Sequence, residues 1–181
     1  MRRYLFPKPY ADLVQRFRVA GGFFLAAAFG IMMRPSAESF ALGAPVAVLG
    51  LVARAWAAGH LAKNERLATS GPYACVRNPL YLGSLLAAAG LVIAARHPLL
   101  ALIFTAVFVL VYLPVIELEE QHLRKLFPEY AVYAERVPML WPRWPAGGAG
   151  RFSWALYARN QEYKAAVAVG IALGLLWWRG S

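Results

Sequence analysis

The 181-residue chain is 60% hydrophobic, with a mean hydropathy of +0.49 and 15% charged residues, against about 25% charged residues in soluble proteins. This composition excludes an ordinary soluble domain and indicates one integral membrane domain spanning residues 1–181. The net charge of +10 does not predict a nucleic-acid partner, because the basic residues flank apolar segments instead of forming one face.

The cysteine and histidine content excludes further classes of site. Cys75 is the single cysteine, so neither an intramolecular disulfide nor a cysteine-based metal cluster can form. His60, His97 and His122 lack the HExxH spacing of zinc sites, and we expect no metal. No small-residue cleavage site follows a short apolar core near the N-terminus, so we do not expect a cleavable signal peptide.

The predicted elements begin with a basic N-terminal arm and continue with five apolar segments. Arg16 and Arg18 alternate with Phe17 and Val19, which is typical of an interfacial segment on anionic lipid. The apolar segments are Phe17–Met33, Phe40–Ala58, Leu80–Ala95, Leu99–Ile116 and Ala165–Trp178. A membrane-spanning helix needs about 17 to 25 residues, so the second and fourth fit, the first and third are short, and the fifth either spans or lies along the interface.

The distribution of basic residues predicts the orientation. If all five segments span, only Arg34, Arg96 and Arg179 fall on one side, and the N-terminal arm and both long loops, with most of the basic residues, fall on the other. By the positive-inside rule that side is cytoplasmic. We therefore expect an all-α, polytopic membrane protein of about five transmembrane helices, in a bacterial or archaeal plasma membrane.

The third and fourth segments should form a helical hairpin, since only the three residues 96–98 join them. Gly83, Ala87 and Gly90 fall on one face of the third helix and permit close helix contact. The hairpin also predicts that residues 77–81 and 116–120 approach each other. Arg54 lies inside the second segment, where it either extends to the lipid headgroups or binds an anionic group.

Three acidic residues, Glu117, Glu119 and Glu120, stand at the predicted end of the fourth helix. Three interpretations are open from the residues alone. They solvate a helix end, Glu119 and Glu120 form an ion pair with Arg77 across the hairpin, or they have a functional role.

Two sequence signatures bear on that choice. GPYACVRNPLYLG, residues 71–83, resembles the G-x-Y-x-x-x-R-H-P-x-Y-x-G signature of the isoprenylcysteine carboxyl methyltransferases and the related phospholipid methyltransferases. A second stretch resembles the other signature of that superfamily, at Ile116, Glu119, Glu120, Leu123, Phe127, Tyr130, Tyr133, Val137 and Pro138. The resemblance divides the chain into an arm with two spans (1–59), a methyltransferase core (60–145) and a C-terminal linker with a short apolar helix (146–181).

This resemblance implies an integral membrane enzyme that uses S-adenosylmethionine, bound in a cytoplasmic pocket formed by the C-terminal half. By position, the cofactor-binding residues would be Glu65, Leu67, Ala68, Tyr73, Arg77, Asn78, Pro79, Leu80, Tyr81 and Glu119. Glu119 and Glu120 would be the catalytic carboxylates. The implied acceptor is a lipophilic, membrane-embedded molecule, either a prenylcysteine-like carboxylate or a lipid amine.

Three positions depart from the family pattern. The histidine of R-H-P is replaced by Asn78, which can donate and accept hydrogen bonds but cannot titrate. Another histidine position holds Glu65. The arginine that the prenylcysteine enzymes carry four residues before the first glutamate is Val115 here, which weakens the case for a prenylcysteine substrate more than the case for the cofactor.

Two other functions remain open from the sequence. Some membrane sterol reductases share a related C-terminal architecture, and such an enzyme would use the basic loops to hold the phosphate of NADPH. A non-catalytic membrane scaffold would instead use the tyrosines as interfacial anchors.

Overall fold

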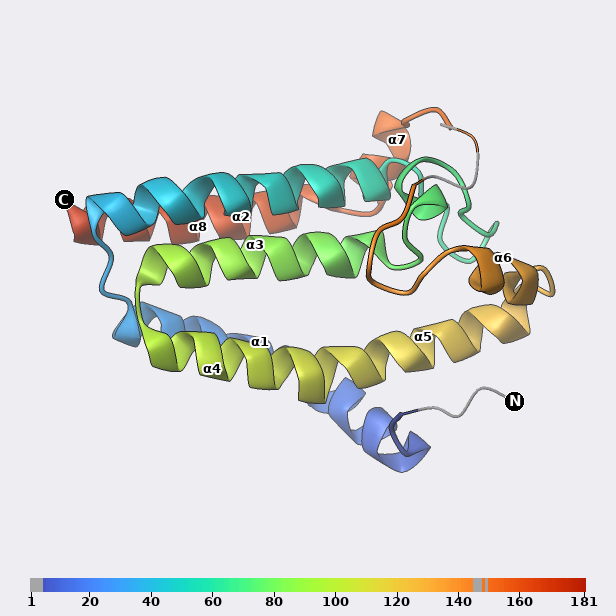
Figure 1. Ribbon diagram of the computed structural model, residues 1–181, viewed down its shortest axis with the longest axis horizontal. Coiled ribbons are helices and arrows are strands. Elements are labelled where there is room, and N and C mark those ends of the chain that lie inside the picture. The colour runs from blue at the N-terminus through green and yellow to red at the C-terminus, as the bar shows by residue number, and fades with distance from the viewer. Residues whose placement is uncertain (1–4, 145–147, 149) are drawn as a thin grey trace.

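The computed structural model describes residues 5–144, 148 and 150–181, which form eight α-helices and no strand (Figure 1). The helices are α1 (Lys8–Met32), α2 (Ala37–Ala58), α3 (Pro79–Ala95), α4 (Pro98–Val107), α5 (Leu113–Leu126), α6 (Tyr130–Arg136), α7 (Trp154–Arg159) and α8 (Tyr163–Gly180). A 3₁₀ turn, η1 (Gly71–Ala74), precedes α3, and a π-helical turn, η2 (Phe108–Tyr112), joins α4 to α5. The all-α expectation is confirmed for this part of the chain. Arg2, Arg3 and the side chains of Arg18 and Val19, which belong to the predicted arm, lie outside the described residues.

Local sequence explains where the long helices begin and end. The side chain of Ser36 accepts a hydrogen bond from the Ser39 amide while Ser39 reciprocates, and this capping box starts α2. Pro79 and Pro98 occupy the first positions of α3 and α4, where the missing amide proton costs nothing. Arg96 adopts a left-handed conformation with φ of 50° and ends α3, so the chain reverses within three residues.

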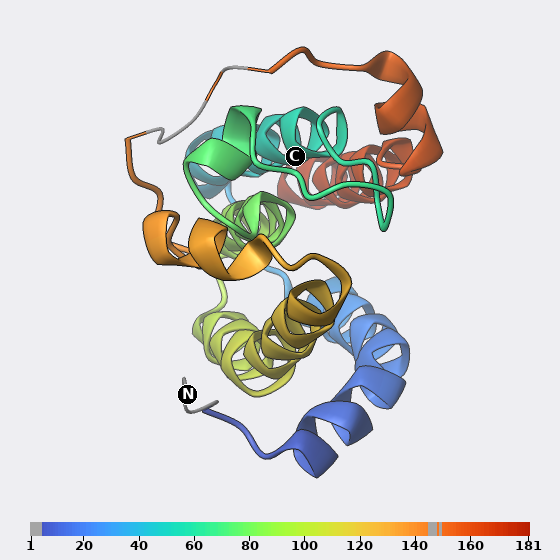
Figure 2. The same cartoon turned by 90° about the vertical axis from the view of Figure 1, so that its right-hand side faces the viewer.

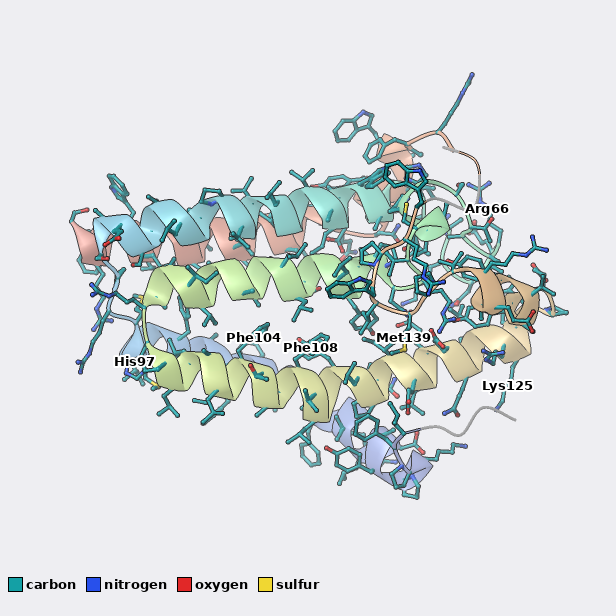
Figure 3. All side chains as sticks on the ribbon, viewed as in Figure 1. Arg66, His97, Phe104, Phe108, Lys125 and Met139 are labelled. Atoms are coloured by element: carbon teal, nitrogen blue, oxygen red, sulfur yellow. The ribbon has the colours of Figure 1, made fainter. Side chains whose placement is uncertain are left out.

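The long helices form two groups that run along the same axis. The views in Figures 1 and 2 place α2, α3 and α8 together and α1, α4 and α5 together, with α6, α7 and the loops gathered at one end. At the opposite end, a small core of Met33, Ala94, Ala95, Leu100 and Leu176 joins the two groups. Figure 3 shows Arg66 and Lys125 at the loop-bearing end and His97 at the other end.

Among the described residues, two helices are long and apolar enough to cross a membrane, namely Ala37–Ala58 and the continuous helix Pro98–Leu126. Ala20–Met32 and Pro79–Ala95 are shorter apolar helices. The second and fourth predicted spans therefore have the dimensions that the sequence indicated.

The small-residue face predicted for the third helix is confirmed, and its partner is α2. A Cβ atom added at Gly83 or Gly90 would collide with the backbone of α2, and one added at Gly43 or Gly50 would collide with the backbone of α3. Contact this close requires glycine on both helices. The packing of α3 is therefore directed to α2, whereas Phe104 and Phe108 project from the α4 side toward α3 (Figure 3).

The π-helical turn has a local chemical cause. In a regular α-helix the carbonyl of Leu110 would accept from the amide of residue 114, but Pro114 has no amide proton. The backbone instead forms a wider turn in which Leu113 N–H donates to the Phe108 carbonyl. The phenol of Tyr10 donates to the Leu110 carbonyl at 2.6 Å, so α1 satisfies the acceptor that the proline leaves without a backbone partner.

Glu117 attaches the start of the described chain to α5. Its carboxylate oxygens accept from the amides of Leu5 and Phe6 at 3.0 and 3.2 Å. Together with Tyr10 these contacts hold α1 along α5. Glu117 is thus a structural residue at this position.

Arg54 points into the protein instead of extending toward lipid. Its guanidinium donates to both oxygens of Glu162 at 2.9 and 2.6 Å, and also to Ser84 and the Leu80 carbonyl. Neither interpretation made from the sequence included this partner, because nothing in the pattern placed residue 162 beside residue 54.

The Arg54–Glu162 pair fixes the first turn of α8 against the last turn of α2. At the far end of the same two helices, the rings of Phe40 and Trp177 meet with centroids 5.3 Å apart. The two helices are therefore antiparallel and side by side over nearly their whole lengths (Figures 1 and 2).

Candidate functional site: a cavity at the loop-bearing end

A cavity of about 470 Å³ opens at the end of the bundle that carries the loops. Its walls come from the loop after α2, the start of α3, α5 and α6, and Gln15 of α1 closes one side. Residues 77–81 and 116–120 meet here, as the hairpin predicted. Cavities of roughly 300 to 1,000 Å³ hold small-molecule ligands and cofactors.

Most of the residues that the resemblance assigned to the cofactor line this cavity. They are Leu67, Ala68, Tyr73, Arg77, Asn78, Pro79, Leu80, Tyr81 and Glu119. Glu65 and Glu120 do not line it. Glu65 is exposed and pairs with Arg159 at 2.6 Å. Cofactor binding by each of these residues remains a prediction.

Glu120 forms a buried ion pair with Arg77, so the ion-pair interpretation is confirmed for this glutamate. Arg77 Nε and Nη2 donate to the two carboxylate oxygens at 2.8 and 3.1 Å, and Nη1 donates to the carbonyls of Ala134 and Val137. The Asn78 amide adds a donor to Glu120 at 3.2 Å. A bidentate ion pair whose remaining guanidinium donors are hydrogen-bonded offsets the cost of removing both charges from water. It ties the first signature to α5 and α6.

Glu119 has a different environment from its neighbour. Glu119 is exposed and lines the cavity, and the phenol of Tyr81 donates a hydrogen bond to its carboxylate at 2.9 Å. Because successive helical residues point about 100° apart, α5 presents one carboxylate to the cavity and the other to Arg77. Of the two adjacent carboxylates, Glu119 is thus the one that faces the cavity.

Three tyrosines form the inner wall of the cavity. Burial raises the pKa of the Tyr73, Tyr130 and Tyr133 phenols well above the usual value near 10, and the charge of Glu120 further raises that of Tyr130. All three therefore stay neutral at physiological pH. The Tyr133 phenol donates to the Tyr73 carbonyl at 2.7 Å, which braces η1 against α6.

Sequence reasoning missed several lining residues. Lys63, Asn64, Arg66 and His122 line the cavity, as do Leu123, Phe127, Tyr130 and Tyr133 of the second signature. The last four could have been found from the sequence, because they belong to the second signature, but the resemblance assigned none of them to the site. Lys63 and Arg66 lie in the polar loop just before the first signature, and no ion-pair partner is found for either among the described residues.

These residues suit S-adenosylmethionine chemically. Neutral aromatic faces attract a sulfonium and stack on adenine, and a carboxylate such as Glu119 accepts from ribose hydroxyls or an ammonium group. Lys63 and Arg66 offer cations for the cofactor's carboxylate. Within the described residues no group of three or more His, Cys, Asp or Glu side chains could hold a metal ion.

A second cavity, of about 640 Å³, adjoins the first one. The two share Leu61, Lys63, Leu80, Tyr81 and Glu119 as lining residues. The second is otherwise lined by Gly22, Arg54, Ser84, Tyr112, Arg159, Asn160, Gln161 and Glu162. Glu119 therefore faces both cavities.

Comparison with known proteins gives the family. Residues 39–130, from α2 to the start of α6, match the model of the phospholipid methyltransferase family. The cobalt-zinc-cadmium resistance protein CzcN of Cupriavidus metallidurans is 39% identical over 97 residues, covering 52% of this chain and 45% of that protein. The nickel-cobalt-cadmium resistance protein NccN of Alcaligenes xylosoxydans xylosoxydans is 34% identical over 110 residues, covering 60% and 52%.

This chain thus spans about half the length of the curated relatives it matches. No solved structure matches it. The family match includes both walls of the first cavity, with the Arg77–Glu120 pair that joins them, and the two candidate membrane helices support the same assignment. The chain is a member of the phospholipid methyltransferase family.

Proposed function

We propose that this protein transfers a methyl group from S-adenosylmethionine to a lipophilic acceptor embedded in the membrane. The observation that carries the proposal is the first cavity, in which residues of two distant signatures surround one space of cofactor size. The family match, residues 39–130, includes most of that lining.

The residues of the cavity have separate roles in this proposal. Tyr73 and Tyr133 stay protonated and provide neutral aromatic surface for the nucleoside and sulfonium, while the buried Tyr130 packs against Tyr133 and supports it. Lys63 and Arg66 bind the carboxylate of the methionine moiety. Arg77 and Glu120 position the loop and act through it, without touching the reacting atoms.

Bound S-adenosylmethionine supplies a methyl group on a sulfonium, which an acceptor lone pair attacks as the carbon–sulfur bond breaks and its electron pair stays on sulfur. Alignment and exclusion of water are then the main tasks of the protein. A lipid amine must also lose a proton, and Glu119 is placed to take it, since its carboxylate faces both cavities. A carboxylate acceptor needs no base.

A lipid amine is the favoured acceptor. The position that holds the carboxylate-binding arginine in the prenylcysteine enzymes is Val115, which is buried here. Two arginines line the second cavity, and each has an acidic partner: Arg54 pairs with Glu162 and Arg159 pairs with Glu65. Lys63 and Glu119 both line the junction. In this proposal Lys63 binds the carboxylate of the cofactor, so Glu119 is the charge that remains to attract the ammonium group of an acceptor.

The proposal includes five membrane-spanning helices with the first cavity in the cytoplasm. Because α8 lies antiparallel to α2 along nearly the same length, both should cross the bilayer if α2 does. Arg34, Arg96 and Arg179 lie at the end remote from the cavity, which the positive-inside rule places outside the cytoplasm.

The test uses the purified full chain in detergent or nanodiscs. Titration calorimetry with S-adenosylhomocysteine should give saturable binding, and NADPH should give none. Incubation with methyl-labelled cofactor and a lipid extract should transfer label to a lipid that mass spectrometry identifies. Binding of NADPH alone would favour the reductase, and binding of neither compound would favour the scaffold.

A further inference from the structure

We infer that the second cavity receives the polar end of the methyl acceptor, and that the Arg54–Glu162 ion pair positions its outer wall and so determines which acceptors fit. This inference rests on the proposed function. It assigns a role to the corner between α7 and α8, which lies beyond the residues that the family model matches.

The position of the second cavity fits an acceptor. It shares Leu80, Tyr81 and Glu119 with the cofactor cavity, so a molecule held there meets the cofactor at the shared boundary. Its other walls come from Gly22 of α1, the α2–α3 interface, and Tyr112 of the π-helical turn. These parts lie within the helices that span the bilayer in the proposed topology, whereas the first cavity is lined mainly by the loop after α2, α5 and α6.

The Arg54–Glu162 pair is well placed to hold this wall. Arg54 of α2 contacts two other elements at once, the α7–α8 corner through Glu162 and α3 through Ser84 and the Leu80 carbonyl. The side chain of Glu162 is only 9% exposed and that of Arg54 is 22% exposed. Asn160 adds hydrogen bonds to the Ala58 and Leu61 carbonyls at 2.9 Å each, which fixes the same corner to the end of α2.

The electrostatics of the pair indicate a positioning role over direct binding. Both carboxylate oxygens of Glu162 are engaged by Arg54, so the pair presents a neutral polar wall to the cavity. Removing one partner leaves the other charge uncompensated in a partly buried place. The wall would then move or attract counter-ions, and the shape offered to an acceptor would change while the cofactor cavity keeps its lining.

The kinetic test compares Glu162→Gln with the wild-type enzyme, using the lipid that the labelling assay identifies. We expect the acceptor KM to rise about tenfold, equivalent to about 1.4 kcal/mol, with kcat and the Kd for S-adenosylhomocysteine little changed. The charge-swapped double variant, Arg54→Glu with Glu162→Arg, should recover much of the acceptor KM. Glu38→Gln makes the same chemical change at the exposed far end of α2 and should leave all three constants unchanged.

An unchanged acceptor KM in Glu162→Gln would overturn the inference. So would an equal loss of acceptor and cofactor affinity, because it would indicate general damage to the fold. Thermal unfolding of each variant separates that damage from a local effect.

A binding experiment separates this inference from the proposed function. A phosphatidylethanolamine that carries a photoreactive diazirine near its headgroup is incorporated in nanodiscs, and its crosslinks are mapped by mass spectrometry. We expect labelling at residues 159–162 that Ser84→Trp abolishes by filling the cavity, while Leu86→Trp, on the exposed side of α3, retains it. Labelling that survives Ser84→Trp would overturn the inference even for an active methyltransferase, whereas absence of methyl transfer to any lipid would overturn the proposed function.

Discussion

Two adjacent glutamates on α5 have opposite environments. Glu120 is bound by Arg77 and Asn78 in the interior, and Glu119 contacts Tyr81 at the junction of two cavities. The residue type is the same, so the difference comes from the direction in which each position of the helix points. Stability and ligand binding should therefore separate cleanly between them.

Glu120→Gln should destabilise the protein by about 3–5 kcal/mol, because it leaves the buried Arg77 guanidinium without its counter-charge. Glu119→Gln should change stability by less than about 0.5 kcal/mol, as an exposed substitution does, but lower the affinity for S-adenosylhomocysteine. Thermal unfolding and titration calorimetry on both variants measure the two effects. Equal loss of stability in both would contradict the assignment.

The buried tyrosines predict the behaviour of the protein at high pH. Since burial raises the pKa of Tyr73 and Tyr130, their phenols stay protonated in the folded state while the same groups ionise near pH 10 in the unfolded state. Their contribution is complete below pH 10, and above it stability should fall as pH rises, by up to about 1.4 kcal/mol per pH unit for each tyrosine.

Unfolding temperatures measured from pH 8 to 11 test this dependence. Tyr73→Phe removes one ionisable group and should flatten the decline above pH 10. A decline equally steep in wild type and variant would assign the effect to other groups.

The sequence predicted the site to the extent that its residues are contiguous or belong to a signature. Tyr73, residues 77–81 and Glu119 were assigned from the sequence and lie together at the first cavity. Lys63 and Arg66 were not, because the path of the loop after α2 depends on tertiary contacts such as those of Asn160 with the Ala58 and Leu61 carbonyls. Glu65 was assigned by position, but its carboxylate pairs with Arg159 and it does not line the cavity.

At the scale of elements, the close packing of α2 on α3 is the main contact within the group of α2, α3 and α8. A Cβ on Gly50 would meet the Ala87 amide nitrogen and the Gly83 carbonyl oxygen, both backbone atoms that cannot move alone. The two helices would have to separate along their shared face. The start of α3 carries the first signature, so such a separation would reach the site.

Gly50→Ala should therefore destabilise the protein by about 1–3 kcal/mol through overpacking. Gly170→Ala is the matched control on α8, where nothing lies within 4 Å of the added atom, and it should be neutral or stabilising by about 0.5–1 kcal/mol. Thermal or chemical unfolding in one detergent gives both values. Equal effects would show that the α2–α3 contact is less tight than described.

The apolar segments predicted most of the long helices because apolar length and turn residues are local signals. The partner of α3 was not predicted, because a face of small residues indicates close contact without saying with which helix. The π-helical turn was also not predicted from the sequence. Its cause, Pro114, is visible in the chain, but its satisfaction by Tyr10 depends on a contact about one hundred residues away.

At the scale of the whole molecule, the arrangement predicts where each end of the bundle meets water. In a Cys75→Ala background, Lys125→Cys at the loop-bearing end and Ser181→Cys at the remote end are single labelling sites. A membrane-impermeant maleimide should label position 181 in intact cells and position 125 only in inverted vesicles. Labelling of both from the same side would exclude α8 as a span.

The π-helical turn at 108–112 contains one residue more than an α-helical turn, because its amide bonds five residues back instead of four. The helix after the turn therefore keeps nearly the direction that it would have after a regular α-helical turn. Deleting Val109 should return the turn to α-helical length and leave Glu119 directed at both cavities. We expect the shortened protein to accumulate in membranes and still bind S-adenosylhomocysteine, which would identify this turn as a place where the long helix tolerates a change of length.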